Sequence, residues 1–415
     1  MSIELNNPKP LEGLRICDFF WLIAGPACSR VFADWGAEVI KVESSNRLDE
    51  IRQTGSWPPD SVRSDDSHNG VFNDCNTSKK AIQVDLNTEK GIEVIKRLIA
   101  KSDIVTNNFT GERMDRWGLG YEDLKKINPE LIMLTMPVMG TTGPQRNFGA
   151  IGNNVIALGG INYAMGFPGT PPTGMGPLYS DFAAPYFAAS AILAALYHRD
   201  KTGEGQFIDL AQFQATASLL GPALLDYSAN KTVPERPGNA HPDFAPHGVY
   251  PCAPATHNSD RWLALSIEND LAWERFTELI ADPVLSDKSK FATNNLRKTH
   301  ETLLNDAIAN YTSNHDVWVL VGRLQDEGIT AGVTQDLSDV LDRDPGMRTQ
   351  HFENLTDLAG RVTYTTHRQP VRINEQTAPM GRAPLFGEHN YEVYTDLLGY
   401  SDIEYAELVA AGIVN

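Results

Sequence analysis

The chain of 415 residues has few cysteines and little positive charge. None of the four cysteines forms a C-x-x-C pair, which argues against a disulfide framework or a zinc site and favours reduced, mostly buried thiols. Thirty-five Lys plus Arg face fifty-three Asp plus Glu, for a net charge of -18. A generic binder of nucleic acid or of anionic membranes is therefore not expected, and any phosphate-bearing ligand needs a local basic patch.

Long apolar runs are also missing. The most apolar segment, residues 182–197, contains Pro185 and Ser190 and falls short of the roughly 20 apolar residues of a bilayer span. We therefore expect a buried core helix there. The first residues lack the basic stretch and apolar core of a signal peptide. These features predict a cytoplasmic protein without a membrane span.

The glycine patterns of nucleotide-binding loops are absent as well. Gly25 alone lies between the first predicted strand and helix, where a dinucleotide site needs G-x-G-x-x-G. The sequence has no G-x-x-x-x-G-K-[ST] loop and no H-E-x-x-H motif. Nicotinamide, nucleotide-hydrolysis and zinc functions lose their main support, and no metal is expected.

Strands and helices alternate along the first half of the chain. β-prone residues 14–20 and 38–43 flank a helical stretch, 27–35, which is the pattern of a β-α-β unit. The alternation continues with a helix at 89–101, strands at 103–106, 131–136 and 207–210, and a helix that starts near Asp181. This pattern predicts a parallel sheet flanked by helices.

Composition divides the chain into three parts. We expect a large α/β domain over residues 1–228 and a smaller α+β domain over 229–344, with a polar, proline-containing linker at 230–243 between their cores. The second part contains a predicted strand, 261–267, and a predicted helix, 270–280. Residues 345–415 are rich in proline before a helical end, and we expect them to pack onto another part of the chain.

Blocks of residues along the whole chain resemble the class III coenzyme A transferases of the CaiB/BaiF type, a family that includes formyl-CoA transferase and α-methylacyl-CoA racemases. The blocks are residues 10–18 (PLEGLRICD), 24–26 (AGP), 34–43 (DWGAEVIKVE), 108–109 (NF), 116–121 (RWGLGY), 198–206 (HRDKTGEGQ) and 387–389 (GEH). The resemblance implies a doubly wound, Rossmann-like large domain formed from both termini, with the small domain between them. It also implies an interlocked dimer, either a homodimer or a heterodimer with a related subunit.

The resemblance places the catalytic nucleophile at Asp181. In the family an aspartate attacks the acyl-CoA thioester and forms first an acyl mixed anhydride and then an aspartyl-CoA thioester. A carboxylate can divide acyl transfer in this way if water is excluded. Position alone, at the start of an apolar helix, favours an ordinary cap or first-turn acid.

The resemblance also assigns contacts with coenzyme A, for which Lys79 is a further basic candidate. The implied contacts are Leu22, Ala24, Asn108, Phe109 and Arg116. The alternatives are that Lys79 and Lys80 form a solvated turn, and that Arg116 pairs with an acid such as Glu112.

Two positions depart from family patterns, and His247 is a further candidate. Ile23 stands where formyl-CoA transferase has a glutamine, so Trp21 and Ile23 predict a larger, more apolar acyl pocket, unless they simply fill core. Ile151 replaces the catalytic histidine of the racemases and cannot carry a proton. His247 could bind an acceptor carboxylate, although a satisfied loop histidine is the simpler interpretation.

These observations predict a CoA-transferase. It would move coenzyme A from a donor such as succinyl-CoA to a carboxylic acid bulkier than formate, such as a dicarboxylate or an aryl-substituted succinate. An acyl-CoA racemase or isomerase is the alternative enzyme. A CoA-binding subunit of a hetero-oligomeric transferase is the alternative from another class.

Overall fold

The computed structural model describes residues 9–53, 70–176, 178–254, 260–358, 360 and 362–414. The chain divides into two compact units. Unit 1 consists of Met1–Asn162, Gly174–Val233 and His351–Asn415, and unit 2 of Tyr163–Thr173 and Pro234–Gln350.

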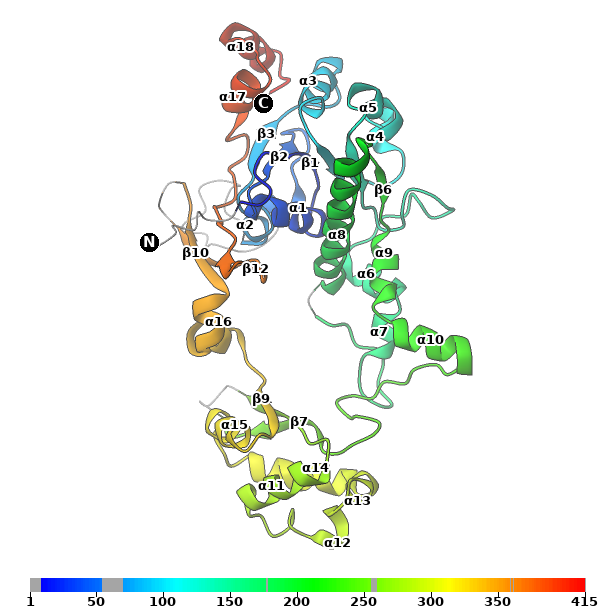
Figure 1. The fold of residues 1–415 in the computed structure, drawn as a ribbon, viewed down its shortest axis with the longest axis vertical. Helices are drawn as coiled ribbons and strands as arrows, with labels where there is room; N and C mark the ends of the chain where they lie inside the picture. Colours follow the sequence, from blue (N-terminus) through cyan, green and yellow to red (C-terminus); the bar gives the residue numbers. More distant parts are fainter. Residues whose placement is uncertain are drawn as a thin grey trace. The chain divides into compact units, whose positions relative to one another are not determined.

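Unit 1 is built on a six-stranded parallel sheet in the order β3-β2-β1-β4-β5-β6 (Figure 1). Its strands are β1 (Arg15–Phe19), β2 (Glu38–Glu43), β3 (Lys80–Gln83), β4 (Ile104–Asn107), β5 (Ile132–Thr135) and β6 (Phe207–Asp209). The predicted α/β class with a parallel sheet is confirmed. The strand order reverses between β1 and β4, which is the switch point of a doubly wound sheet. Strand β3 was not predicted.

Helices cover both faces of this sheet, because side chains of a strand alternate between its faces. Cys17 and Phe19 of β1 pack with α3 (Glu89–Ile99) and α5 (Tyr121–Ile127). Ile16 and the following Phe20 pack on the other face with α1 (Ala24–Asp34) and α8 (Tyr179–Thr202). Unit 1 therefore has a hydrophobic core on each face of β1.

The C-terminal segment covers the edge strand β3. The Gln83 amide donates to Asn390 Oδ1 at 2.7 Å, and the Tyr394 hydroxyl donates to the Gln83 carbonyl oxygen at 2.7 Å. This segment contains β10 (Phe352–Thr356), β11 (Thr363–His367), β12 (Arg372–Ile373), β13 (Gln376–Thr377), α17 (Asn390–Glu392), η3 (Val393–Leu397) and α18 (Asp402–Ala410). It therefore satisfies backbone groups that an open sheet edge would expose.

Helix α8 corrects one expectation. The prediction of a wholly buried helix is wrong, because Phe182, Tyr186 and Tyr197 are exposed while Ala184, Ala188 and Ile192 face the sheet. Within the part of the chain that the structure describes, no helix is long and apolar enough to cross a membrane.

The other short helices of the α/β part connect the strands and the layers. They are η1 (Glu50–Arg52), α2 (Gly70–Cys75), α4 (Arg113–Arg116), α6 (Gly152–Leu158), α7 (Ile161–Ala164), α9 (Gln212–Ser218) and α10 (Gly221–Asn230). All four cysteines of the chain are free and buried.

Unit 2 combines an antiparallel sheet with helices. The sheet has the order β7 (His247–Cys252), β8 (Arg261–Ser266) and β9 (Thr330–Val333). Leu263 and Leu265 of β8 pack with Phe276 of α11 (Asp270–Ile280) in its core. The remaining helices are α12 (Lys288–Phe291), α13 (Asn294–Thr299), α14 (Glu301–Thr312), α15 (Val317–Asp326), η2 (Asp339–Arg343) and α16 (Pro345–Gln350). Strand β8 and helix α11 were predicted, whereas β7 and β9 were not.

Candidate active site

A cavity of about 720 Å³ lies within unit 1 at the carboxyl ends of the parallel strands. A residue within three positions of the end of each strand contributes to its wall. These lining residues are Trp21 after β1, Ser44 after β2, Val84 after β3, Asn108 after β4, Val138 after β5 and Gln212 after β6. Doubly wound sheets bind ligands in this position.

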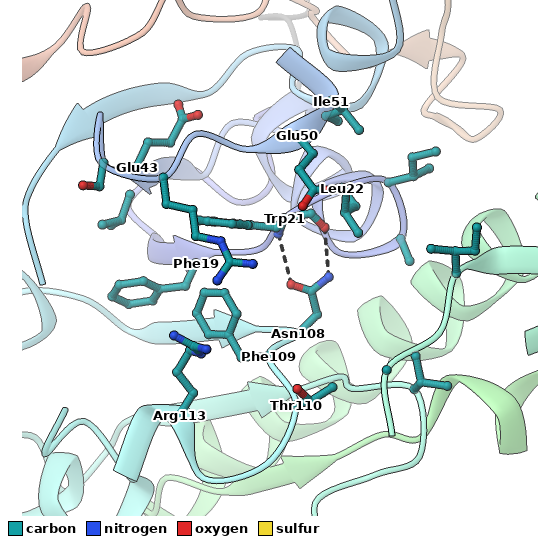
Figure 2. Close-up of a pocket in the computed structure, with 18 of the residues that line it drawn as sticks. Phe19, Trp21, Leu22, Glu43, Glu50, Ile51, Asn108, Phe109, Thr110 and Arg113 are labelled. Carbon is teal, nitrogen blue, oxygen red and sulfur yellow. Dashed lines mark hydrogen bonds between the residues drawn. The ribbon is translucent and has the colours of Figure 1, made fainter. Parts of the chain in front are cut away.

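An amide joins the two strands on either side of the switch point. Asn108 Oδ1 accepts from the Trp21 amide at 3.0 Å, and Asn108 Nδ2 donates to the Trp21 carbonyl oxygen at 2.9 Å (Figure 2). Both backbone groups of Trp21 are satisfied by one side chain. Asn108 therefore fixes the turn that follows β1.

A buried ion pair holds the next residue of this turn. Leu22 has φ of 62°, a left-handed conformation that costs an L-residue about 1 kcal/mol or more. Its amide donates to Asp49 Oδ1 at 3.0 Å, while Asp49 Oδ2 receives Lys41 Nζ at 2.9 Å. Lys41 Nζ also donates to the Phe20 carbonyl oxygen at 2.7 Å. The pair thus fixes the backbone on both sides of Trp21.

Three aromatic rings form a ladder in the cavity wall. Trp21 and Phe109 meet edge to face with centroids 5.8 Å apart, and Phe109 meets Trp117 in the same manner at 5.7 Å. Arg47 lies over the Trp21 ring at 5.2 Å, and Arg113 over the Trp117 ring at 5.6 Å. Figure 2 shows Phe109 between Trp21 and Arg113.

The two arginines of this ladder give the cavity local positive charge. Among the described residues, neither Arg47 nor Arg113 forms an ion pair with a carboxylate, and both line the cavity. A guanidinium left without a carboxylate partner is suited to phosphate oxygens. The cavity therefore offers stacking surface and anion-binding groups together.

Asp181 lines the same cavity in the first turn of α8. Its side chain is only 8% exposed, and its carboxylate accepts a hydrogen bond of 3.4 Å from the Ser180 hydroxyl. Burial raises the pKa of Asp181 from 3.8 to about 6, against a smaller lowering by Ser180. No ion pair of Asp181 occurs in the described residues. The site therefore holds a desolvated carboxylate that is more basic than usual and mostly ionised above pH 6.

Gly152 makes room for this carboxylate. A Cβ at Gly152 would lie 2.7 Å from Asp181 Oδ2 and 2.9 Å from Leu178 Cβ. Any larger residue would displace the Asp181 side chain. Gly152 begins α6, so the close approach of α6 and α8 defines the position of the carboxylate.

The structure brings most of the predicted site residues together. The lining of the cavity includes Trp21, Leu22, Ile23, Ala24, Asn108, Phe109 and Asp181. Arg116 is not among the lining residues, whereas Arg113, one turn earlier in α4, is. Glu112, the acid considered for Arg116, instead pairs with Arg146 at 3.1 Å.

Lys79 does not reach the cavity. Its ammonium is fully buried, pairs with Asp18 Oδ2 at 3.2 Å and donates to Ser29, Asn76 and the Pro26 carbonyl oxygen. We therefore withdraw Lys79 as a coenzyme A contact. The alternative of a solvated turn is also wrong, because Lys79 is buried and Lys80 belongs to β3.

The two remaining candidate positions have ordinary surroundings. His247 belongs to unit 2, where its Nδ1 lies 2.6 Å from the Asn239 carbonyl oxygen and its ring contacts His241 and Phe244. Ile151 precedes α6 and lines the cavity with an apolar side chain. The lining residues that the structure describes include no histidine, lysine, tyrosine or cysteine.

Arg47 and Gln212 were missed as site residues by sequence reasoning. Arg47 follows β2 by four residues and reaches the cavity because a bridge between Ser44 and Arg47 turns the chain back. Gln212 lies three residues after β6. The signal available in the sequence was their place just after a predicted strand, where a parallel sheet collects its ligand contacts.

The family model for CoA-transferase family III matches residues 11–390. The chain belongs to this family. It is 32% identical to succinyl-CoA--D-citramalate CoA-transferase of Chloroflexus aurantiacus, over 98% of each chain. The beta subunit of succinyl-CoA--L-malate CoA-transferase from the same organism is 29% identical, again over 98% of both. A crystal structure of a CAIB/BAIF family protein from Brucella suis superimposes with a TM-score of 0.85 at 29% identity, and covers 94% of this chain and 100% of its own.

Family membership confirms the resemblance read from the sequence blocks and makes the chain a transferase enzyme whose substrates are CoA thioesters. The resemblance had also included racemases, and the relatives named here are transferases that act on succinyl-CoA. The cavity at the strand ends is therefore the candidate active site of a family III CoA-transferase.

Proposed function

We propose that this transferase moves coenzyme A from succinyl-CoA to a carboxylic acid, with Asp181 as the covalent nucleophile. The observation that supports it most is the buried Asp181 carboxylate, whose pKa is raised to about 6 in the same cavity as the aromatic ladder. A raised pKa makes the ionised carboxylate a stronger nucleophile, and it remains ionised at neutral pH.

The covalent steps balance without any further reactant. An Asp181 oxygen attacks the thioester carbonyl carbon. The C–S bond breaks, the CoA thiolate is released, and the acyl group remains on Asp181 as a mixed anhydride. The thiolate then attacks the carbonyl carbon of Asp181 and releases the first acid as a carboxylate. The second acid attacks the aspartyl thioester and forms a new mixed anhydride, and the thiolate finally attacks its acyl carbon and releases Asp181.

Coenzyme A would lie along the aromatic ladder. We propose that Arg47 and Arg113 bind its phosphates, because both guanidinium groups line the cavity without a carboxylate partner in the described residues. Leu22, Ala24, Asn108 and Phe109 would form the wall against which the cofactor packs. The pantetheine thiol would then extend toward Asp181.

For the accepting acid we propose a dicarboxylate. The relatives named above act on D-citramalate and L-malate, both with succinyl-CoA. Trp21 and Ile23 give the cavity an apolar wall that suits an acid larger than formate. An aryl-substituted succinate would also match this wall.

We further propose that unit 1 is the large coenzyme A domain, unit 2 the small domain, and the active protein an interlocked dimer. The exposed face of α8 supports a partner, because Tyr179, Phe182, Tyr186, Phe187, Leu193 and Tyr197 all lie open on it. Monomeric proteins rarely expose such a continuous apolar patch. The partner would be a second copy, or a related subunit as in the relative that is named a beta subunit.

Covalent trapping tests the proposed nucleophile. The purified chain is incubated with succinyl-CoA, treated with hydroxylamine and mapped by peptide mass. Modification of Asp181, with complete loss of transfer in Asp181→Ala, is the expected result. Transfer that survives Asp181→Ala refutes the mechanism. A deuterium-exchange assay without acceptor acid tests a racemase, which the cavity does not favour because Ile151 stands at the position of the racemase histidine and the described lining includes no histidine.

A further inference from the structure

Gln212 is a buried amide that the transfer chemistry described above does not use. It is the first residue of α9, lines the cavity and is 6% exposed. Its Nε2 donates to the Met136 carbonyl oxygen at 2.9 Å, and its backbone amide donates to the Pro137 carbonyl oxygen at 3.1 Å. Both contacts are to the segment that follows β5. The side chain is therefore held in one orientation.

Part of the amide is left without a partner. In the described structure, the one hydrogen bond of the Gln212 side chain runs from Nε2 to the Met136 carbonyl oxygen. An amide has two N–H donors and one carbonyl acceptor. Since Gln212 lines the cavity and Nε2 uses one N–H for Met136, the second N–H is available to a ligand oxygen.

The surroundings make this amide distinctive. The lining side chains at the end of β5 and at the starts of α1, α6 and α8 are apolar apart from Asp181: they are Ile23, Ala24, Val138, Ala150, Ile151 and Leu178. The other amide near the switch point, Asn108, is occupied on both sides by Trp21. Gln212 thus lines the same cavity as Asp181, and its helix α9 packs against α8, which carries Asp181.

We propose that Gln212 binds an oxygen of the acyl group or acid that reacts at Asp181, through the second N–H of its amide. This inference rests on the proposed function. A neutral donor suits the position for a physical reason. A cation there would stabilise the Asp181 carboxylate and lower its pKa, which would weaken the nucleophile, whereas an amide orients the acid without adding a full charge.

The near-isosteric variant Gln212→Met tests this role in the full-length enzyme. Removing a hydrogen bond to a charged oxygen should lower kcat/KM for the acid about 10- to 100-fold. The dissociation constant for free coenzyme A should stay within about twofold of the wild type, since the proposed phosphate contacts are elsewhere in the cavity. Gln214→Met, at an exposed position of the same helix, is the matched control and should change neither quantity.

A second variant guards against a purely structural effect, because Gln212→Met also loses the bond to Met136. Gln212→Glu keeps the length but brings a negative charge toward the acid, so we expect a larger loss that shrinks as the pH falls. Equal losses of acid turnover and coenzyme A affinity in both variants would show a structural role and overturn the proposal. The proposal would also be overturned if kcat/KM for the acid stayed within twofold of the wild type in either folded variant.

Trapping separates this inference from the function on which it rests. If hydroxylamine modifies Asp181 in the wild type and the Gln212 variants transfer normally, the inference alone fails. If the wild type shows no modification at Asp181 while it binds coenzyme A, the proposed function itself fails.

Discussion

Replacing the buried carboxylate of Asp181 by an amide should stabilise the protein while it abolishes transfer. In the folded chain burial holds the pKa of Asp181 at about 6, whereas the ordinary value is 3.8. The folded state therefore binds a proton more tightly than the unfolded state does. Its stability falls as the pH rises between these two values.

The magnitude follows from the two pKa values. Above pH 6 their difference lowers the free energy of unfolding by about 3 kcal/mol. Below the pKa of the unfolded state, 3.8, the effect disappears. Asp181→Asn removes this cost. The free energy of unfolding of the variant, relative to the wild type, should therefore increase by about 1.5 kcal/mol between pH 5 and pH 8.

The assay is denaturant unfolding of both proteins at several pH values in one buffer series. Any difference in packing or hydrogen bonding between the asparagine and the acid does not vary with pH, so the slope is the diagnostic quantity. Asp200→Asn, at an exposed position near the other end of α8, is the control and should not reproduce the slope. A difference between Asp181→Asn and wild type that is flat from pH 5 to pH 8 refutes the reasoning.

Other perturbations follow from contacts at the cavity. Gly152→Ala forces a Cβ to within 2.7 Å of the Asp181 carboxylate and should lower kcat at least 10-fold, and it should lower the free energy of unfolding by about 1–3 kcal/mol. Arg47→Ala and Arg113→Ala should each weaken coenzyme A binding about 5- to 30-fold by calorimetry, more at low salt, whereas Arg116→Ala should not. Asp49→Asn should raise KM for succinyl-CoA, because it releases the turn after β1, and should lower the melting temperature by several degrees.

The parts of the fold that the sequence predicts are those that follow from periodicity. Strands β1 and β2 are short β-prone runs on either side of a helical stretch, and α3 repeats its apolar residues at helical spacing, so each is visible locally. Strand β3 is four residues long and begins with Lys80, directly after the charged Lys79. This strand forms because it pairs with β2, and Lys79 is buried because it pairs with Asp18. No local sequence pattern shows either contact.

The same distinction applies to the site. Asn108 and Phe109 could be selected because they lie in sequence blocks that resemble a family, and Asp181 because the resemblance aligns it with the nucleophile of that family. Gln212 lies outside those blocks, and it lines the cavity because β6 ends beside β5. The exposed face of α8 was missed for a related reason: a helix that is apolar all round has the same composition whether it is covered by its own chain or by a partner.

Net charge is the least informative of these sequence properties about the ligand. A value of -18 predicts repulsion of polyanions, and the argument holds for the average surface. In the structure, many basic side chains are committed to carboxylates, as Arg52 is to Glu43 at 2.7 Å. An anionic cofactor can bind to those few basic side chains that form no ion pair with a carboxylate. Arg47 and Arg113, held over aromatic rings in the cavity wall, can attract phosphate in a protein whose total charge opposes it.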